Sequence, residues 1–201
     1  MRTITTASFA AAVILACMLA LAGCKSITAA SAGPGPTGPD GAKVGGEEVK
    51  SFDLNRDKKP DVWVYSRKVP DPAKPGVNKE LILRKEMDLN FDGKVDVWKY
   101  YGENGEVVKE CFDLDFDGKI DECTFYEKGI LVRKEVDLNF DGKPDLFKYY
   151  EKGKLTRKER ASKGDGKIDY WEYYEGDEVD RIGIDTNGDG QVDVWQKRQQ
   201  K

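Results

Sequence analysis

The stretch Asp88-Leu-Asn-Phe-Asp-Gly-Lys-Val-Asp96, followed by Val97-Trp98-Lys99-Tyr100-Tyr101, decides the fold. Its first half places an oxygen-bearing side chain at positions one, three, five and nine and contains Asp-Gly, a strong turn signal. Its second half alternates aromatic or apolar residues with other residues, the period-two pattern typical of a β-strand. The stretch therefore predicts a polar loop that leads directly into a strand.

The same pattern recurs along the chain. Six segments align without gaps, at spacings of 35, 25, 24, 24 and 24 residues, and the first spacing is longer because of a Pro-rich insertion at 68–79. They begin at Asp53, Asp88, Asp113, Asp137, Ala161 and Asp185. A Gly-bearing turn follows each aromatic strand, and a second strand leads to the next loop. Each repeat is thus predicted to be one hairpin plus one loop.

The predicted fold class is all-β. We expect an elongated antiparallel array, either a single-layer sheet or a solenoid, of about six β-hairpin repeats of ~24 residues. Long apolar runs are absent after residue 24, so a thin core is expected. Whether the hairpins form a flat ribbon, a solenoid or a closed ring is left open by the pattern.

Four loops read D-x-[DN]-x-D-G-x-x-D, which suits calcium. This hard cation takes six to eight oxygen ligands. Positions one, three, five and nine offer side-chain oxygens, glycine at position six permits the sharp turn, and position seven offers its backbone carbonyl. The predicted ligands are Asp88, Asn90, Asp92, Lys94 and Asp96; Asp113, Asp115, Asp117, Lys119 and Asp121; Asp137, Asn139, Asp141, Lys143 and Asp145; and Asp185, Asn187, Asp189, Gln191 and Asp193.

The other two loops are incomplete. The first has Lys58 in place of the glycine, so its binding of an ion is left open, although it keeps Asp53, Asn55, Asp57 and Asp61. The fifth has Ala161 and Lys163 at ligand positions, and no ion is expected there. About four calcium ions are therefore predicted. The alternative is a set of Asp-Gly turns without an ion, but a turn needs only one aspartate, and clustered carboxylates repel one another.

The loops resemble the first nine residues of an EF-hand loop, without its bidentate glutamate at position twelve. They are also similar to the calcium loops of integrin-type propeller blades and thrombospondin type 3 repeats. The whole repeat, from Phe52 to Trp195, resembles MORN-type repeats. The first likeness implies weak calcium binding, roughly 10⁻⁴–10⁻³ M. The last implies a single-layer run of hairpins that serves as a scaffold.

The N-terminal residues read as an export signal. Arg2 is the only charge before Lys25, and the apolar run at 7–22 is too short to span a membrane comfortably. It ends in Leu21-Ala22-Gly23-Cys24, which resembles the lipobox of bacterial lipoproteins. The resemblance implies lipid on the Cys24 thiol and cleavage before it, and Lys25 favours the outer membrane. An ordinary signal peptide or an uncleaved anchor is the alternative.

The predicted domain organisation has three parts. Residues 1–23 form the lipoprotein signal peptide, residues 24–50 the lipidated cysteine and a Gly/Pro/Ala linker, and residues 51–201 the repeat domain. Cys111 and Cys123 flank the third loop, and in an oxidising compartment they are predicted to form a disulfide.

Two rows of residues share a repeat position. The aromatic row is expected to stack on one face as a thin core, with a sugar-binding platform as the alternative. It contains Trp63, Trp98, Phe147, Trp171 and Trp195. The basic row is expected to be a solvated strand face, with a ladder for anionic polysaccharide as the alternative. It contains Arg84, Lys109, Arg133, Arg157 and Arg181.

Composition narrows the function. The chain has no histidine and a net charge of −4, which argue against an enzyme that uses the commonest general base and against a nucleic-acid binder. The aspartates are better explained as ligands than as a catalytic pair. We therefore expect a calcium-binding, lipid-anchored envelope scaffold with a protein or polysaccharide partner. The alternatives are a carbohydrate-binding accessory protein and a spacer that binds only calcium.

Overall fold

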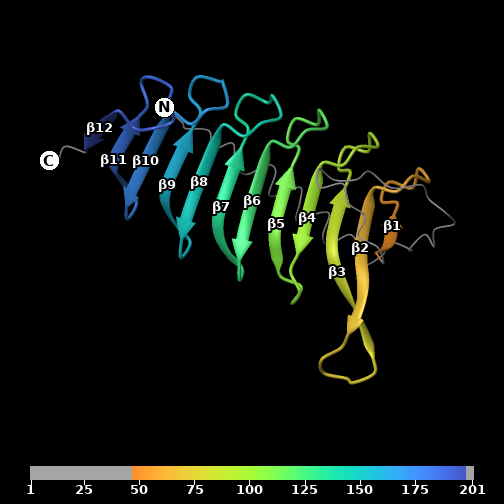
Figure 1. Ribbon diagram of the computed structural model, residues 1–201. Coiled ribbons are helices and arrows are strands. Elements are labelled where there is room, and N and C mark those ends of the chain that lie inside the picture. Colours follow the sequence, from red (N-terminus) through yellow and green to blue (C-terminus); the bar gives the residue numbers. More distant parts are fainter. Residues whose placement is uncertain (1–46, 198–201) are drawn as a thin grey trace, which may run out of the picture.

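The computed structural model describes residues 47–197, which form one open, single-layer antiparallel sheet of twelve strands in chain order (Figure 1). The strands are β1 (Glu48–Phe52), β2 (Val62–Pro70), β3 (Asn78–Met87), β4 (Val97–Tyr101), β5 (Val107–Phe112), β6 (Glu122–Glu127), β7 (Ile130–Val136), β8 (Leu146–Glu151), β9 (Lys154–Arg160), β10 (Tyr170–Glu175), β11 (Glu178–Ile184) and β12 (Val194–Lys197). The predicted all-β array is confirmed. It is an open sheet, with β1 and β12 at its two edges.

Some predictions fall outside this part of the chain. The signal peptide, the acceptor Cys24 and the linker up to residue 46 are not among the described residues. Within residues 47–197, no helix is long and apolar enough to cross a membrane.

The two kinds of connection lie at opposite ends of the strands. All six polar loops gather along one side of the sheet, and the short hairpin turns and the 71–77 insertion lie along the other (Figure 1). Two of the hairpins turn through a pair of residues with positive φ: Lys128 at 51° with Gly129 at 76°, and Lys152 at 51° with Gly153 at 78°. Such turns match the right-handed twist of the flanking strands. The alternation of loops and hairpin turns therefore brings every predicted ligand to the same side of the sheet, at the ends of the strands.

Each face of the sheet carries its own small core near the loops. On one face, Trp63, Tyr65 and Trp98 are buried together with the two cysteines and with Val95 from the second loop. The other face buries Val62, Met87 and Val97, with Leu54 and Leu89 from the first two loops packed against them. Loop residues thus cover both faces of the sheet. The conformation of the loops and the packing of the two core clusters therefore depend on each other.

The aromatic row shares one face, but its rings do not stack on one another as expected. The strand between each pair interposes another residue, as Glu86 does between Trp63 and Trp98. Burial also falls along the row, because Trp98 is 6% exposed and Trp195, on the edge strand, is 50% exposed. The row is therefore a graded core.

The predicted disulfide is confirmed. Cys111 and Cys123 are directly opposite one another on β5 and β6 and are bonded. Both are buried in the first core cluster, where Cys123 takes the place of the aromatic ring of other repeats. The bond therefore ties together the two strands that hold the third loop.

The basic row corrects an expectation, since these residues are not simply solvated. The Arg84 guanidinium lies 3.5 Å from the centroid of the Tyr65 ring and bonds Glu86. Stacking on an aromatic ring recurs at Arg133, Arg157 and Arg181. Ion pairs with a glutamate two residues further on recur at Arg133 and Arg157. These arginine side chains thus contact aromatic rings and glutamates of the sheet itself, which weakens the case for a basic ladder that binds polysaccharide.

Candidate metal centre

The six loops lie in a fixed register along the side of the sheet where these strand ends meet. They are numbered here as loop 1 (53–61), loop 2 (88–96), loop 3 (113–121), loop 4 (137–145), loop 5 (161–169) and loop 6 (185–193). The N–H of the first residue of one loop donates to the carbonyl of the last residue of the loop before it. Asp113 bonds Asp96 in this way at 2.8 Å, and Asp137 bonds Asp121 at 2.7 Å. Neighbouring loops are therefore linked by backbone.

The first and last aspartates close each complete loop. In loop 2, the two carboxylate oxygens of Asp88 accept the N–H groups of Phe91 and Gly93, both at 2.7 Å. One oxygen of Asp96 accepts the N–H of Leu89 at 2.6 Å. Both aspartates are almost completely buried. Backbone N–H groups thus fix these carboxylates before any ion is considered.

Positions three and five are exposed and point toward each other. Asn90 Oδ1 accepts the N–H of Asp92 at 2.9 Å, and Asp92 Oδ1 accepts the N–H of Lys94 at 2.8 Å. The Asn90 amide also donates to Asp92 Oδ2 at 3.2 Å. The same amide-to-carboxylate bond recurs in loops 4 and 6. In these loops the amide N–H donates to the carboxylate oxygen that a bound cation would otherwise contact.

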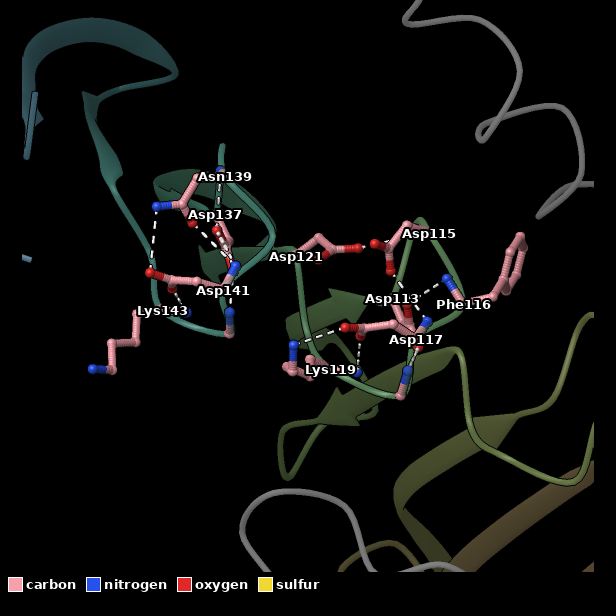
Figure 2. A network of polar contacts seen from close by, with 12 residues as sticks. Asp113, Asp115, Phe116, Asp117, Lys119, Asp121, Asp137, Asn139, Asp141 and Lys143 are labelled. Carbon is pink, nitrogen blue, oxygen red and sulfur yellow. Dashed lines mark hydrogen bonds and ion pairs between the residues drawn. The ribbon is translucent and has the colours of Figure 1, made fainter. Parts of the chain in front are cut away.

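Loop 3 has the strongest set of acidic ligands. Asp113, Asp115 and Asp117 each place a carboxylate oxygen within 4.8 Å of the other two. Asp115 has no amide to offer its neighbour, and the Lys119 ammonium instead bonds Asp117 Oδ2 at 2.8 Å (Figure 2). That hydrogen bond lowers the pKa of Asp117. Figure 2 shows loops 3 and 4 side by side, each curled around its own oxygens.

An orphaned oxygen in loop 2 supports the fit of a cation. Asp96 is 1% exposed, and its Oδ1 has no hydrogen-bond partner within residues 47–197. Burial, with repulsion from Asp88 and Asp113, raises the pKa of Asp96 to about 6. Burial likewise raises the pKa of Asp121. A carboxylate oxygen buried without a donor is costly, and a hard divalent cation would satisfy it.

This raised pKa predicts a pH dependence for the protein in chelator. A carboxyl with a higher pKa in the folded chain than in the unfolded chain binds its proton more tightly when folded. Its contribution to stability is therefore present at low pH and is lost as pH rises through about 6. We expect the melting temperature in chelator to rise as pH falls from about 7.5 to about 5.

Asp96→Asn is the control, because asparagine mimics the protonated acid. In chelator it should melt above the parent at neutral pH and show a smaller rise on acidification. An unchanged pH profile in this variant would contradict the assignment to Asp96.

Loop 5 has a lysine ammonium where the other loops have a candidate ion ligand. Lys163, at a ligand position, places its ammonium 3.6 Å from Asp169 Oδ2 and donates to the Asp185 carbonyl at 3.4 Å. The loop thus replaces an ion with a lysine of its own. Loop 1 differs, because Asp53 accepts the N–H of Lys58 at 2.9 Å although Lys58 adopts a positive φ of 75°. Loop 1 therefore keeps this turn despite the missing glycine, but among residues 47–197 three carboxylates lie within 4.8 Å of one another only in loop 3.

Contacts between loops were not foreseen from the sequence. The Lys94 ammonium reaches from loop 2 to the Asp117 carbonyl of loop 3, at 3.3 Å. The Lys119 side chain passes beside Gly142 of loop 4. The sequence does show a lysine repeated at position seven of loops 2 to 5. Only the structure shows that the lysines of loops 2 and 3 extend to the next loop.

Comparisons with known proteins agree with the loop motif and go little further. The EF-hand family model matches residues 110–123, which include the whole of loop 3. No curated protein matches the chain. A similar solved structure is that of accessory secretory proteins 1, 2 and 3 of Streptococcus pneumoniae, at 15% identity and a TM-score of 0.34, covering 67% of this chain and 20% of that one.

Proposed function

We propose that this chain is a calcium-binding, lipid-anchored envelope protein that acts as a structural and interaction scaffold. The observations that carry the proposal are the carboxylate cluster of Asp113, Asp115 and Asp117 in loop 3, the same loop pattern repeated along that side of the sheet, and the orphaned Oδ1 of Asp96. The EF-hand match at 110–123 supports the same ion.

The chain's own residues suit this role. Side-chain oxygens at positions one, three, five and nine would hold the ion, with the carbonyl at position seven completing a set of oxygen ligands. The ion supplies positive charge to the clustered carboxylates. Because loop residues such as Val95 and Leu89 also cover the two core clusters, ordering a loop orders the packing beside it.

The remaining parts of the proposal follow from the sequence. Lipid on Cys24 would place the sheet at the envelope, with the outer membrane favoured by Lys25. We propose no enzymatic activity, since the aspartates serve as loop ligands. A protein or polysaccharide partner completes the proposal. A spacer that binds only calcium is the outcome if envelope extracts give no reproducible partner.

A calcium titration followed by amide NMR tests the ion sites one by one. The N–H groups of four loop glycines donate to the first aspartate of their own loop, and they should shift saturably as calcium reaches the millimolar range. These glycines are Gly93, Gly118, Gly142 and Gly190. Gly166 of loop 5 should stay unchanged at the same concentrations.

Paired variants sharpen this titration. Asp115→Ala with Asp117→Ala removes the exposed ligands of loop 3 and leaves its buried aspartates intact, so the Gly118 response should disappear while the other three persist. Asp165→Ala, at the matching position of loop 5, should change no response. Glycine signals that stay constant up to tens of millimolar calcium would overturn the proposed function.

A further inference from the structure

Three consecutive loops hold a phenylalanine out into solvent at the same position. Phe91, Phe116 and Phe140 are 47%, 43% and 46% exposed. Each occupies position four of its loop, with a φ of 64°, 66° and 60° respectively. Figure 2 shows the Phe116 ring pointing away from the carboxylates of loop 3. These three residues are named here the phenylalanine row.

The loop conformation does not require phenylalanine. Positive φ is unfavourable for a bulky side chain, whereas glycine adopts it freely. Glycine does occupy position four in loops 5 and 6, as Gly164 and Gly188, with φ of 70° and 82°. The row thus keeps three rings where both backbone and solvent disfavour them, which points to a role outside the fold.

The spacing of the row suits a broad partner surface. The three loops leave the same sheet edge and are two strands apart, so neighbouring rings are spaced by roughly 10 Å. Leu114 and Leu138, 43% and 44% exposed, lie in the same loops. Apolar side chains repeated at this spacing along one side of a sheet can enter a broad surface together.

The charge of these loops depends on the ion. Loops 2 to 4 contain ten aspartates and three lysines, a net charge of −7, which three calcium ions would bring to −1. Without calcium an anionic membrane repels this edge. With calcium the repulsion is nearly gone, and an ion that takes the Asp117 carboxylate would release the Lys119 ammonium, which pairs with it here, toward lipid phosphates.

We propose that the phenylalanine row is a calcium-dependent docking surface for an anionic phospholipid bilayer. The rings enter the interface between headgroups and acyl chains, and the loaded loops lie against the headgroups. This inference rests on the proposed calcium binding, and it adds a membrane contact separate from any lipid on Cys24. The spread of the rings over three successive loops and the ion-controlled charge favour a bilayer over a protein pocket.

Co-sedimentation with vesicles of phosphatidylcholine and phosphatidylglycerol tests this docking. The chain from residue 25 is suitable, because all twelve strands and both core clusters lie within residues 47–197. We expect calcium to increase the bound fraction roughly tenfold or more over chelator. The triple variant Phe91→Gly, Phe116→Gly, Phe140→Gly should lose this increase and still fold, because glycine suits the positive φ.

A matched control removes apolar surface elsewhere. Val77 and Ile130, both 48% exposed, lie at the turn edge of the sheet, so Val77→Ser with Ile130→Ser should bind vesicles as the parent does. Equal binding of the triple phenylalanine variant and the parent would overturn the proposal. Calcium-dependent self-association that needs the same rings, seen by sedimentation without vesicles, would instead assign the row to a second copy of the chain.

The glycine amide titration separates the two levels of inference. If the loop glycines respond to calcium and the parent still fails to bind vesicles, the docking surface is refuted while the calcium function stands. If the glycines do not respond, the calcium function falls, and the docking mechanism falls with it.

Discussion

Calcium at about 10 mM should raise the melting temperature of chelator-treated protein by roughly 15 °C or more. For dissociation constants of roughly 10⁻⁴–10⁻³ M, each site contributes about 1.4–2.7 kcal/mol at this concentration if the unfolded chain does not bind. Four independent sites would add about 6–11 kcal/mol. The physical source is the relief of repulsion among carboxylates, including the buried Asp96 with its unpartnered Oδ1.

Differential scanning calorimetry with two salt controls makes this measurement specific. Potassium chloride at matched ionic strength screens charge but supplies no ligand-bound ion, so its effect should be small. Magnesium requires near-ideal octahedral geometry and sheds its water reluctantly, so it should stabilise less than calcium. If potassium chloride raised the melting temperature as much as calcium does, the effect would be charge screening, and the loops would be turns that bind no ion.

Replacing Trp98 by alanine should lower the free energy of unfolding by about 3–5 kcal/mol. Trp98 is 6% exposed and belongs to the core cluster formed with Trp63, Val95 and the disulfide. Its removal would leave a cavity in a sheet only one layer thick, where few side chains can move to fill it. Urea unfolding followed by circular dichroism would measure the loss.

Trp195→Ala is the matched control, because Trp195 occupies the same repeat position on the edge strand β12. It is 50% exposed, and the residue opposite is Gly183. We expect this variant to lose about 1 kcal/mol or less, since only part of the ring is removed from water. Trp98→Phe should lie between the two, because it keeps a ring and deletes the buried indole N–H that has no partner within residues 47–197. Equal losses at positions 98 and 195 would contradict the graded core.

Several features were determined by the sequence alone, because their causes lie within one repeat. The period of about 24 residues, the strands after each loop and the Gly-bearing turns follow from local alternation and from glycine and aspartate placement. The oxygen-bearing side chains of each loop also follow, since a nine-residue segment contains them all. The disulfide was predictable too, because Cys111 and Cys123 flank the same loop.

Only the tertiary structure decided how one repeat meets the next. Trp98 and Trp195 have the same local sequence role, yet the strands on both sides of β4 bury the first and the sheet edge exposes the second. The stacking of Arg84 on Tyr65 joins two neighbouring strands, and the reach of Lys94 to loop 3 joins two repeats. The burial of Asp96 likewise depends on packing across strands. The sequence pattern repeats, whereas burial and charge depend on which strand lies alongside.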